Sequence, residues 1–219
     1  MATTLLQFRD SLRNLLSDKT QWRDTLLTTW IQDAIRDYSA SLPRLLRSTI
    51  NCLAGQTAYS LSSFTILQVR AVEYPSGQTP RRLLAPLKRS HAGFAGGPYY
   101  ELQADHLALY IGESPASGED ILLEYDSLHA IPSSDSTELT VPAQHFELLR
   151  LYVIWKATIQ LETDENVSVD RKRDVMNALG LNSYRAERAY RSRLRDILAG
   201  LAPGGVAGSW KMDKKDRIY

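Results

Sequence analysis

The order of hydrophobic patterns along the 219 residues constrains this chain more than any single motif. Apolar side chains recur every three or four positions in residues 1–50, alternate with polar ones in 51–140, and return to the helical period in 141–202. The first spacing is typical of an amphipathic helix and the second of a half-buried strand. The sequence therefore predicts an α+β fold: a helical bundle with an inserted antiparallel β-module and an extended C-terminal arm, residues 203–219. Such a build favours an assembly component over an enzyme.

Four amphipathic stripes predict the helices of the bundle. Two of them precede Pro43, which cannot continue a helix and so ends the second. The third begins near Pro142, whose missing N–H costs nothing in a first helical turn. The last covers about 168–198, and Gly180 weakens it by about 1 kcal/mol relative to alanine, which favours a kink at that point.

The middle of the chain shows the alternation of strands. Five or so short alternating runs, bounded by Pro and Gly turns, predict a small sandwich or an open barrel. The segment GESPASGED is predicted to be a hairpin loop between two strands, and AGFAGGP a flexible loop. The alternating residues are Thr57, Tyr59, Leu61, Ile66, Gln68, Val69, Ala71, Val72, Leu107, Leu109, Ile111, Ile121, Leu123 and Tyr125.

The composition excludes several classes of protein. Hydrophobic residues make up 43% of the chain and charged residues 23%, which is ordinary for a globular protein. No apolar run approaches the ~18 residues of a membrane span, and the first residues lack the pattern of a signal peptide. The lone Cys52 excludes an intrachain disulfide and, with only four scattered histidines, a cysteine-based zinc site. We therefore expect a reducing, cytoplasmic site of synthesis.

A search for catalytic motifs finds none of the common ones. The chain lacks a phosphate-binding GxxxxGK[ST] loop, GxGxxG, HExxH, GxSxG and a CxxC pair. Adjacent residues on a strand point to opposite faces, so Asp105 and His106 are not expected to meet, and His145 is expected to be a solvated or cap-side group. We therefore predict no enzymatic activity, no cofactor and no metal. The nearest acid and base pairs are Asp105 with His106, Asp126 with His129, and His145 with Glu147.

The net charge of +1 is the sum of unequal regions. Residues 1–50 carry +2, residues 51–167 carry −7, and residues 168–219 carry +6. An acidic middle and a basic end predict attraction to another copy of the chain, to nucleic acid, or to an acidic partner. The alternative is that these charges only solvate separate faces.

The stretch YRAERAYRSRLRD places a row of guanidinium groups on one face of the last predicted helix. Such a row is suited to follow nucleic-acid phosphates. The alternative is a solubilising helix in which Glu187 pairs with Arg191. No helix-turn-helix or aromatic platform accompanies the row, so we expect no sequence-specific DNA binding. The row consists of Arg185, Arg188, Arg191 and Arg195, with Arg193 beside it.

The C-terminal tail combines a flexible start with an apolar end. PGGVAG separates the chain from the last helix, and SWKMDKKDRIY follows with bulky groups set among charges. Burying one aromatic side chain contributes about 1.5–3 kcal/mol, so the tail is predicted to anchor in a neighbouring subunit. The alternative is a frayed end whose tryptophan packs back onto its own bundle. The anchor residues are Trp210, Lys211, Met212, Lys214, Lys215, Arg217, Ile218 and Tyr219.

The chain resembles the head-to-tail adaptor (connector) proteins of tailed bacteriophages. The similarity lies in the helix WIQDAIRDYSASLPR, the strands around AYSL and VRAVEYP, the hairpin from ELQADHLALYIG to PASGEDILLEYDSLH, the helix entry LTVPAQHFELLRLYVIWKA and the tail. It implies a ring of about twelve copies in the virion neck, docked beneath the portal protein, with the genome passing through its lumen. In such proteins the C-terminal arm commonly contacts the portal, which corresponds here to residues 204–219.

The β-module is larger than in the purely helical adaptors. Its partner therefore stays open among a tail nozzle, a stopper and tail-fibre proteins. We expect synthesis in the host cytoplasm, possible non-specific contact with genomic DNA, and no contact with a membrane. The alternative function is a non-enzymatic nucleic-acid-binding protein that uses the basic C-terminal helix. Tight, salt-sensitive DNA binding by a monomer would distinguish that protein from a ring-forming adaptor.

Overall fold

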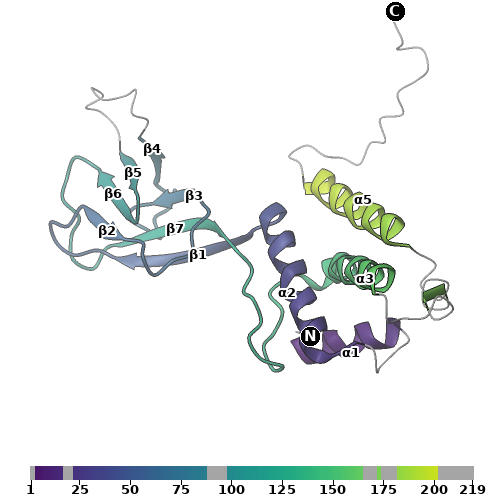
Figure 1. Ribbon diagram of the computed structural model, residues 1–219. Helices are drawn as coiled ribbons and strands as arrows, with labels where there is room; N and C mark the ends of the chain where they lie inside the picture. The colour runs from purple at the N-terminus through teal and green to yellow at the C-terminus, as the bar shows by residue number, and fades with distance from the viewer. Residues whose placement is uncertain (1–2, 17–21, 88–97, 165–171, 174–181, 202–219) are drawn as a thin grey trace, which may run out of the picture. The chain divides into compact units, whose positions relative to one another are not determined.

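The structure is a computed structural model that describes residues 3–16, 22–87, 98–164, 172–173 and 182–201 (Figure 1). The chain folds into two compact units. The helical unit is built from residues 1–42 and 130–219, and the sheet unit is Pro43–His129. The predicted α+β fold, a helical bundle with an inserted sheet, is confirmed.

Both boundaries of the sheet unit lie earlier than predicted. Strand β1, Arg44–Asn51, starts directly after the proline that ends the second helix, so residues 44–50 belong to the sheet. Two leucines and two arginines crowd the start of this strand, which hides its alternation in the sequence. Residues 130–140 belong to the helical unit because they pair with the start of its first helix, where Thr4 and Glu138 form an isolated antiparallel bridge.

The helices of the described residues begin and end at identifiable signals. The first starts at a capping box in which Thr4 and Gln7 exchange backbone and side-chain hydrogen bonds. The second ends just before Pro43, as predicted. The third starts later than predicted, because Pro142 precedes a short 3-10 turn, and the predicted kink at Gly180 lies outside the described residues. The elements are α1 (Leu5–Leu15), α2 (Asp24–Ser41), η2 (Ala143–His145), α3 (Phe146–Thr163) and α5 (Ser183–Leu201).

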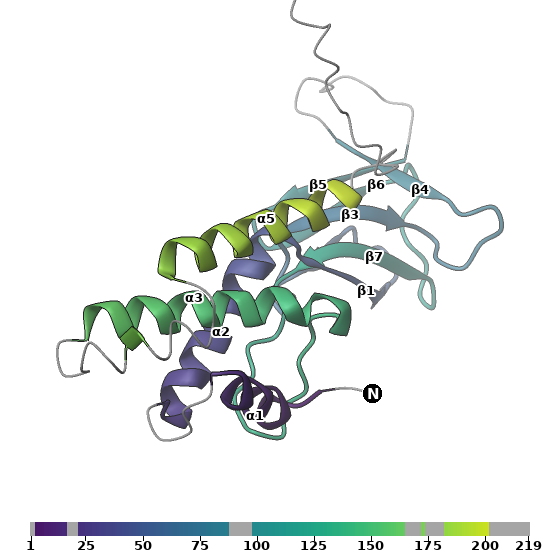
Figure 2. The same cartoon turned by 90° about the vertical axis from the view of Figure 1, so that its right-hand side faces the viewer.

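Helix α3 lies at the centre of the helical unit, between α2 and α5 (Figure 2). Apolar residues cover most of its circumference, which is typical of a helix with neighbours on several sides. Helix α1 packs against α2, and Trp22, just before α2, meets Trp30 of α2 with their ring centroids 5.6 Å apart. The buried residues of α3 are Leu148, Leu149, Tyr152, Val153, Ile154, Ala157, Thr158 and Leu161.

A buried arginine ties α1 to the segment that returns from the sheet unit. Arg9 is only 5% exposed, and its two terminal nitrogens donate to both carboxylate oxygens of Asp135 at 2.9 Å. The same guanidinium donates to Thr28 Oγ1 at 3.3 Å and lies 3.5 Å from Asp24 Oδ1. Because a bidentate pair fixes both distance and orientation, Arg9 holds three segments in one arrangement.

The sheet unit is one curled sheet of seven described strands, which confirms the open-barrel prediction (Figure 1). The strand order is β1-β7-β3-β4-β5-β6-β2, so β1 and β2 form its edges. Apolar side chains of β7, among them Ile121, Leu123 and Tyr125, belong to its core. The strands are β1, β2 (Ala58–Ser60), β3 (Gln68–Glu73), β4 (Leu83–Pro86), β5 (Tyr99–Gln103), β6 (His106–Tyr110) and β7 (Asp120–Ser127).

Two predictions about the sheet are wrong. The sheet is mixed rather than purely antiparallel, because β4 and β5 run parallel. GESPASGED is not a hairpin loop, since β6 pairs with β5 and β2 while β7 pairs with β1 and β3. The tight hairpin in this region joins β5 to β6, and its turn contains Ala104 at φ +50°. The predicted flexible loop AGFAGGP lies outside the described residues.

Candidate interaction surfaces

One face of α5 carries the predicted arginine row and is exposed along its whole length. Arg185 and Arg188 are exposed and make no ion pair with any residue that the structure describes. Arg191 Nε donates to Glu187 Oε1 at 2.7 Å, which is the predicted intrahelical pair. Arg193 leaves the row and pairs with Glu147 of α3 at 3.2 Å. The row is therefore partly used within the helix and partly available to a partner.

Packing against α3 determines which way α5 turns this face. Ala186 and Tyr190 are buried on the opposite side, and the rings of Tyr190 and Tyr152 meet edge to face at 5.4 Å. The Tyr190 hydroxyl donates to Asp37 of α2, and burial together with that carboxylate raises the pKa of Tyr190. The guanidinium of Arg191 lies 6.0 Å from the ring centre of Trp155. These contacts fix the rotation of α5, so that the arginines point away from the core.

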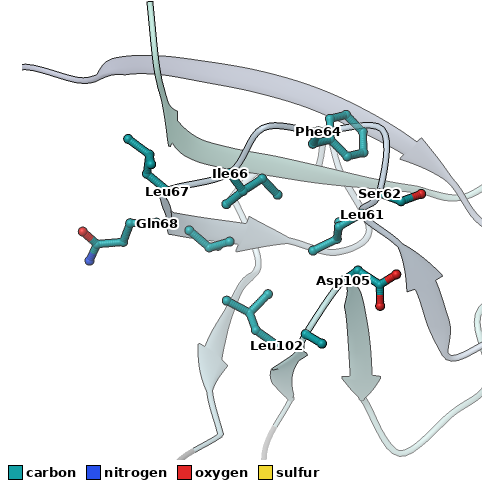
Figure 3. Close-up of a pocket in the computed structure, with 10 residues that line it drawn as sticks. Leu61, Ser62, Phe64, Ile66, Leu67, Gln68, Leu102 and Asp105 are labelled. Carbon is teal, nitrogen blue, oxygen red and sulfur yellow. The ribbon is translucent and has the colours of Figure 1, made fainter. Parts of the chain in front are cut away.

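The sheet unit holds a pocket of about 330 Å³ at one end of the curl (Figure 3). It lies between the β2–β3 connection and the β5–β6 turn, and most of its lining is apolar. Asp105 is its only charged lining residue among those the structure describes. Such a site is suited to an apolar side chain of a partner rather than to chemistry on a substrate. The lining residues are Leu61, Ser62, Phe64, Ile66, Leu67, Gln68, Val69, Leu102, Ala104 and Asp105.

No local sequence pattern indicates the whole of this pocket, because it joins residues of two segments, 61–69 and 102–105, that lie far apart in the chain. A signal was present in LSSFTIL, which carries three large apolar residues after Leu61 where a connection between strands needs none. Phe64 and Ile66 pack partly against the sheet core, while Leu67 is more than half exposed.

The sheet also carries ion pairs that bind its strands to one another. The side chain of Glu73 in β3 is buried and accepts from Arg81 Nε at 2.5 Å, and this hydrogen bond lowers the pKa of Glu73. Arg81 reaches Glu124 of β7 at 2.9 Å, and Arg47 of β1 meets the same carboxylate oxygen at 3.0 Å. Arginines of the sheet unit are thus used to join neighbouring strands.

The three acid and base pairs do not form a catalytic site. The prediction that Asp105 and His106 do not meet is wrong: His106 Nδ1 lies 2.7 Å from Asp105 Oδ1. Asp105 sits in the turn beside Ala104, where backbone bending cancels the alternation of a strand. Both side chains are exposed, so the contact is an ordinary surface pair.

The other two pairs are occupied by structural contacts. Asp126 is buried and accepts from Arg70 Nε at 2.7 Å, and His129 is buried as well. His145 takes the cap-side position of the two predicted, because it is the N-cap residue of α3, and a 2.6 Å hydrogen bond joins its Nδ1 to the hydroxyl of Tyr38. Burial, and to a smaller extent the charge of Arg193, lowers the pKa of His145.

The described part of the chain offers no metal-binding cluster and no membrane-spanning helix. Nowhere in it do three His, Cys, Asp or Glu side chains gather in a way that suits a metal ion. None of its helices combines the length and apolar character that a membrane crossing requires. The predicted anchor residues of the tail, from Trp210 to Tyr219, lie outside the described residues.

Comparison with known proteins supplies the identity that the surfaces alone do not. The family model described as SU10 adaptor protein matches residues 3–205, which includes both units. The chain belongs to this family. The resemblance to phage head-to-tail adaptors is thereby confirmed, and the SU10-type adaptor described here is a structural protein of a phage virion.

One solved structure similar to this SU10-type adaptor is the neck of an empty GTA particle computed with C6 symmetry. The identity is 12%, the match covers 82% of this chain and 92% of that chain, and the TM-score is 0.28. A TM-score this low supports no further inference, so the family assignment rests on the family match. No curated protein matches the chain.

Proposed function

We propose that this SU10-type adaptor is a non-enzymatic component of the phage neck that forms a ring beneath the portal. The ring extends the DNA channel and provides the attachment site for tail components. The match of residues 3–205 to the adaptor family carries this proposal. A closed ring of about twelve copies fits this role, because one kind of contact between neighbouring copies then repeats around the channel. The protein is made in the host cytoplasm and reaches its place in the neck during assembly.

The tail is proposed to attach the ring to the portal. Its apolar groups, Trp210, Met212, Ile218 and Tyr219, need a surface to bury against, and Lys211, Lys214, Lys215 and Arg217 are suited to an acidic rim. A tail of this kind orders when it docks, so part of the binding energy offsets the loss of conformational freedom.

The sheet unit is proposed to meet the tail side of the neck. Its pocket offers an apolar recess with one carboxylate, Asp105, at the lining, which suits a bulky apolar residue of a nozzle, stopper or tail-fibre protein. Leu67 and Leu102, both exposed, extend the apolar area beside it. A partner residue seated there is held by burial rather than by charge.

A second candidate function is non-specific nucleic-acid binding by α5. The observation that favours it is the exposure of Arg185 and Arg188 without an ion pair among the described residues. Phosphate contacts of this kind weaken steeply with salt, so tight, salt-sensitive binding of duplex DNA by a monomeric protein would support this candidate over the adaptor.

The attachment of the tail is tested on portal-bearing heads that lack tails. Heads are used to pull down the full chain, a variant without residues 204–219, and the point variants Trp210→Ala and Ser209→Ala. We expect the truncated chain to lose attachment, Trp210→Ala to weaken it, and the neighbouring Ser209→Ala to behave as the full chain. The melting temperature should stay nearly unchanged in all three variants. Undiminished attachment of the truncated chain would contradict the role of the tail.

A further inference from the structure

The outer face of α5 has the composition of a protein interface. We define this face by Tyr184, Arg185, Arg188, Arg191, Arg195 and Leu198, which follow one another along the side opposite the buried Ala186 and Tyr190. Tyr184 is 68% exposed and Leu198 is 39% exposed. A helix that is charged only for solubility does not need a large aromatic and a leucine in solvent. Tyrosine and arginine are the side chains that most often dominate binding energy at protein interfaces.

A complementary acidic face lies on the α1 side of the same unit. We define it by Asp10, Asp24, Asp135 and Glu138; the exposed Leu6 lies one helical turn before Asp10, and its backbone N–H donates to the carbonyl of Asp135. Arg9 pairs with Asp24 and Asp135, and Arg13 pairs with Asp10 and Asp24. The side chains of the two arginines are only 6% and 23% exposed. Four carboxylates therefore meet solvent above two covered guanidinium groups, and the face presents negative charge.

The two faces lie on opposite sides of the helical unit. Helix α5 packs on α3, and α1 packs on α2, with α3 between α1 and α5 in both views (Figures 1 and 2). α5 carries five arginines against Glu187 and Asp196. Two different, complementary faces on opposite sides of one unit make a head-to-tail contact, and such a contact generates a ring when its rotation closes. Opposite potentials also favour the correct partner and orientation.

We propose that the outer face of α5 docks on the acidic face of a second copy, and that this contact joins neighbouring subunits of the ring. The inference rests on the proposed ring and names the surfaces that build it. Tyr184 and Leu198, which lie about 21 Å apart at the two ends of the α5 face, lose water at the two ends of the contact. Arg185 and Arg188, which have no ion pair in the described structure, meet its carboxylates. The arginine row is then an interface between copies and does not line the DNA channel.

Charge reversal tests this contact in the full chain. Arg185→Glu with Arg188→Glu removes no ion pair of the described fold, so the helical unit should fold as before. Arg44→Glu with Arg82→Glu changes the net charge equally at exposed arginines of the sheet unit and serves as the control. Ring content is measured by mass photometry of the protein alone and as copies bound per portal-bearing head. We expect at least about a tenfold lower ring fraction for the α5 variant and no loss for the control.

A charge swap identifies the partner surface. Asp10→Lys with Glu138→Lys alone should also lose rings, and combining these changes with the two α5 reversals in one chain should restore them. Loss without restoration would overturn the pairing with the acidic face. Rings in the α5 variant equal to the control would overturn the inference and leave the proposed ring standing. Normal rings with impaired genome retention would place the arginines in the channel instead. A wild-type chain that forms no ring, alone or on heads, would contradict the proposed function itself.

Discussion

Arginines serve different ends in the two units. In the sheet unit, Arg47, Arg70 and Arg81 each pair with a carboxylate of a neighbouring strand. On α5, Arg185 and Arg188 are exposed and pair with nothing in the part of the chain that the structure describes. The pairing in the sheet is intramolecular and contributes to its stability, whereas Arg185 and Arg188 make no ion pair within the described fold. The comparison separates arginines that join strands from arginines of α5 that are available to a partner.

The largest expected effect separates a structural arginine from an interface arginine. Arg9→Met should lower the free energy of unfolding by about 2–4 kcal/mol, because it removes a buried guanidinium whose carboxylate partner Asp135 remains. The matched change Arg188→Met should alter it by less than about 0.5 kcal/mol. Urea unfolding followed by circular dichroism measures both. Equal destabilisation by the two variants would break the comparison.

The next effect concerns acid stability of the sheet unit. Arg81 lowers the pKa of Glu73, and the hydroxyl of Tyr74 lowers that of Glu119. Near pH 4.5, the ordinary pKa of glutamate, the folded state therefore binds fewer protons than the unfolded chain. The stabilisation from these ionised carboxylates is present above that pH and is lost as the pH falls through the lowered pKa values. Glu73→Gln should flatten the fall in stability between about pH 5 and pH 3. Glu113→Gln, at an exposed carboxylate, should leave the profile unchanged, and identical profiles for both variants would contradict the account.

A smaller effect is expected in the helical unit at milder pH. The pKa of His145 lies below its ordinary value of 6.5, because burial disfavours the charged ring. The neutral ring is thus favoured in the folded state, and stability falls as the pH drops through 6.5 toward the lower folded value. His145→Gln should remove this slope and cost less than about 1 kcal/mol at pH 8. Thermal melts of this variant and of His106→Gln from pH 8 to about pH 5.5 would show it. If the pH slope persists in His145→Gln, it arises from another titrating group and contradicts this prediction.

The smallest effect is expected at the exposed pair in the β5–β6 turn. His106→Ala should change stability by no more than about 0.5 kcal/mol and leave attachment to heads intact, since its contact with Asp105 is a surface pair. Unchanged infectivity of virions that carry this variant checks the claim. A neck that assembles fully but loses infectivity would indicate chemistry that the structural account does not contain.

Local signals in the sequence predicted the first three helices, whereas the last helix, predicted over about 168–198, is wrong in its start because α5 begins at Ser183 after the non-helical Asn182. Pro43 ends α2 because no helix continues through its ring, and the spacing of apolar residues on α3 matches its buried side. Alternation also located β7, whose inward residues Ile121, Leu123 and Tyr125 are buried. These features depend on residues a few positions apart, which is the range that periodicity describes.

The remaining features depend on partners far apart in the chain. The parallel pairing of β4 with β5, and the antiparallel pairing of β7 with β1 rather than with β6, are set by how the sheet curls over its core. The pocket joins Leu61 and Val69 to Leu102 of a distant segment, so no local pattern describes it. Arg9 is buried through its contact with Asp135, 126 positions further along the chain, which no local pattern on α1 indicates.

The most direct test of the central claim is cryo-electron microscopy of portal-bearing, tailless heads incubated with the purified full chain. The account predicts a new ring of density on the portal axis, made of repeated copies in which the helical unit and the sheet unit are both recognisable. Heads that remain unchanged at saturating protein would contradict the claim that this chain is the ring-forming adaptor of the neck.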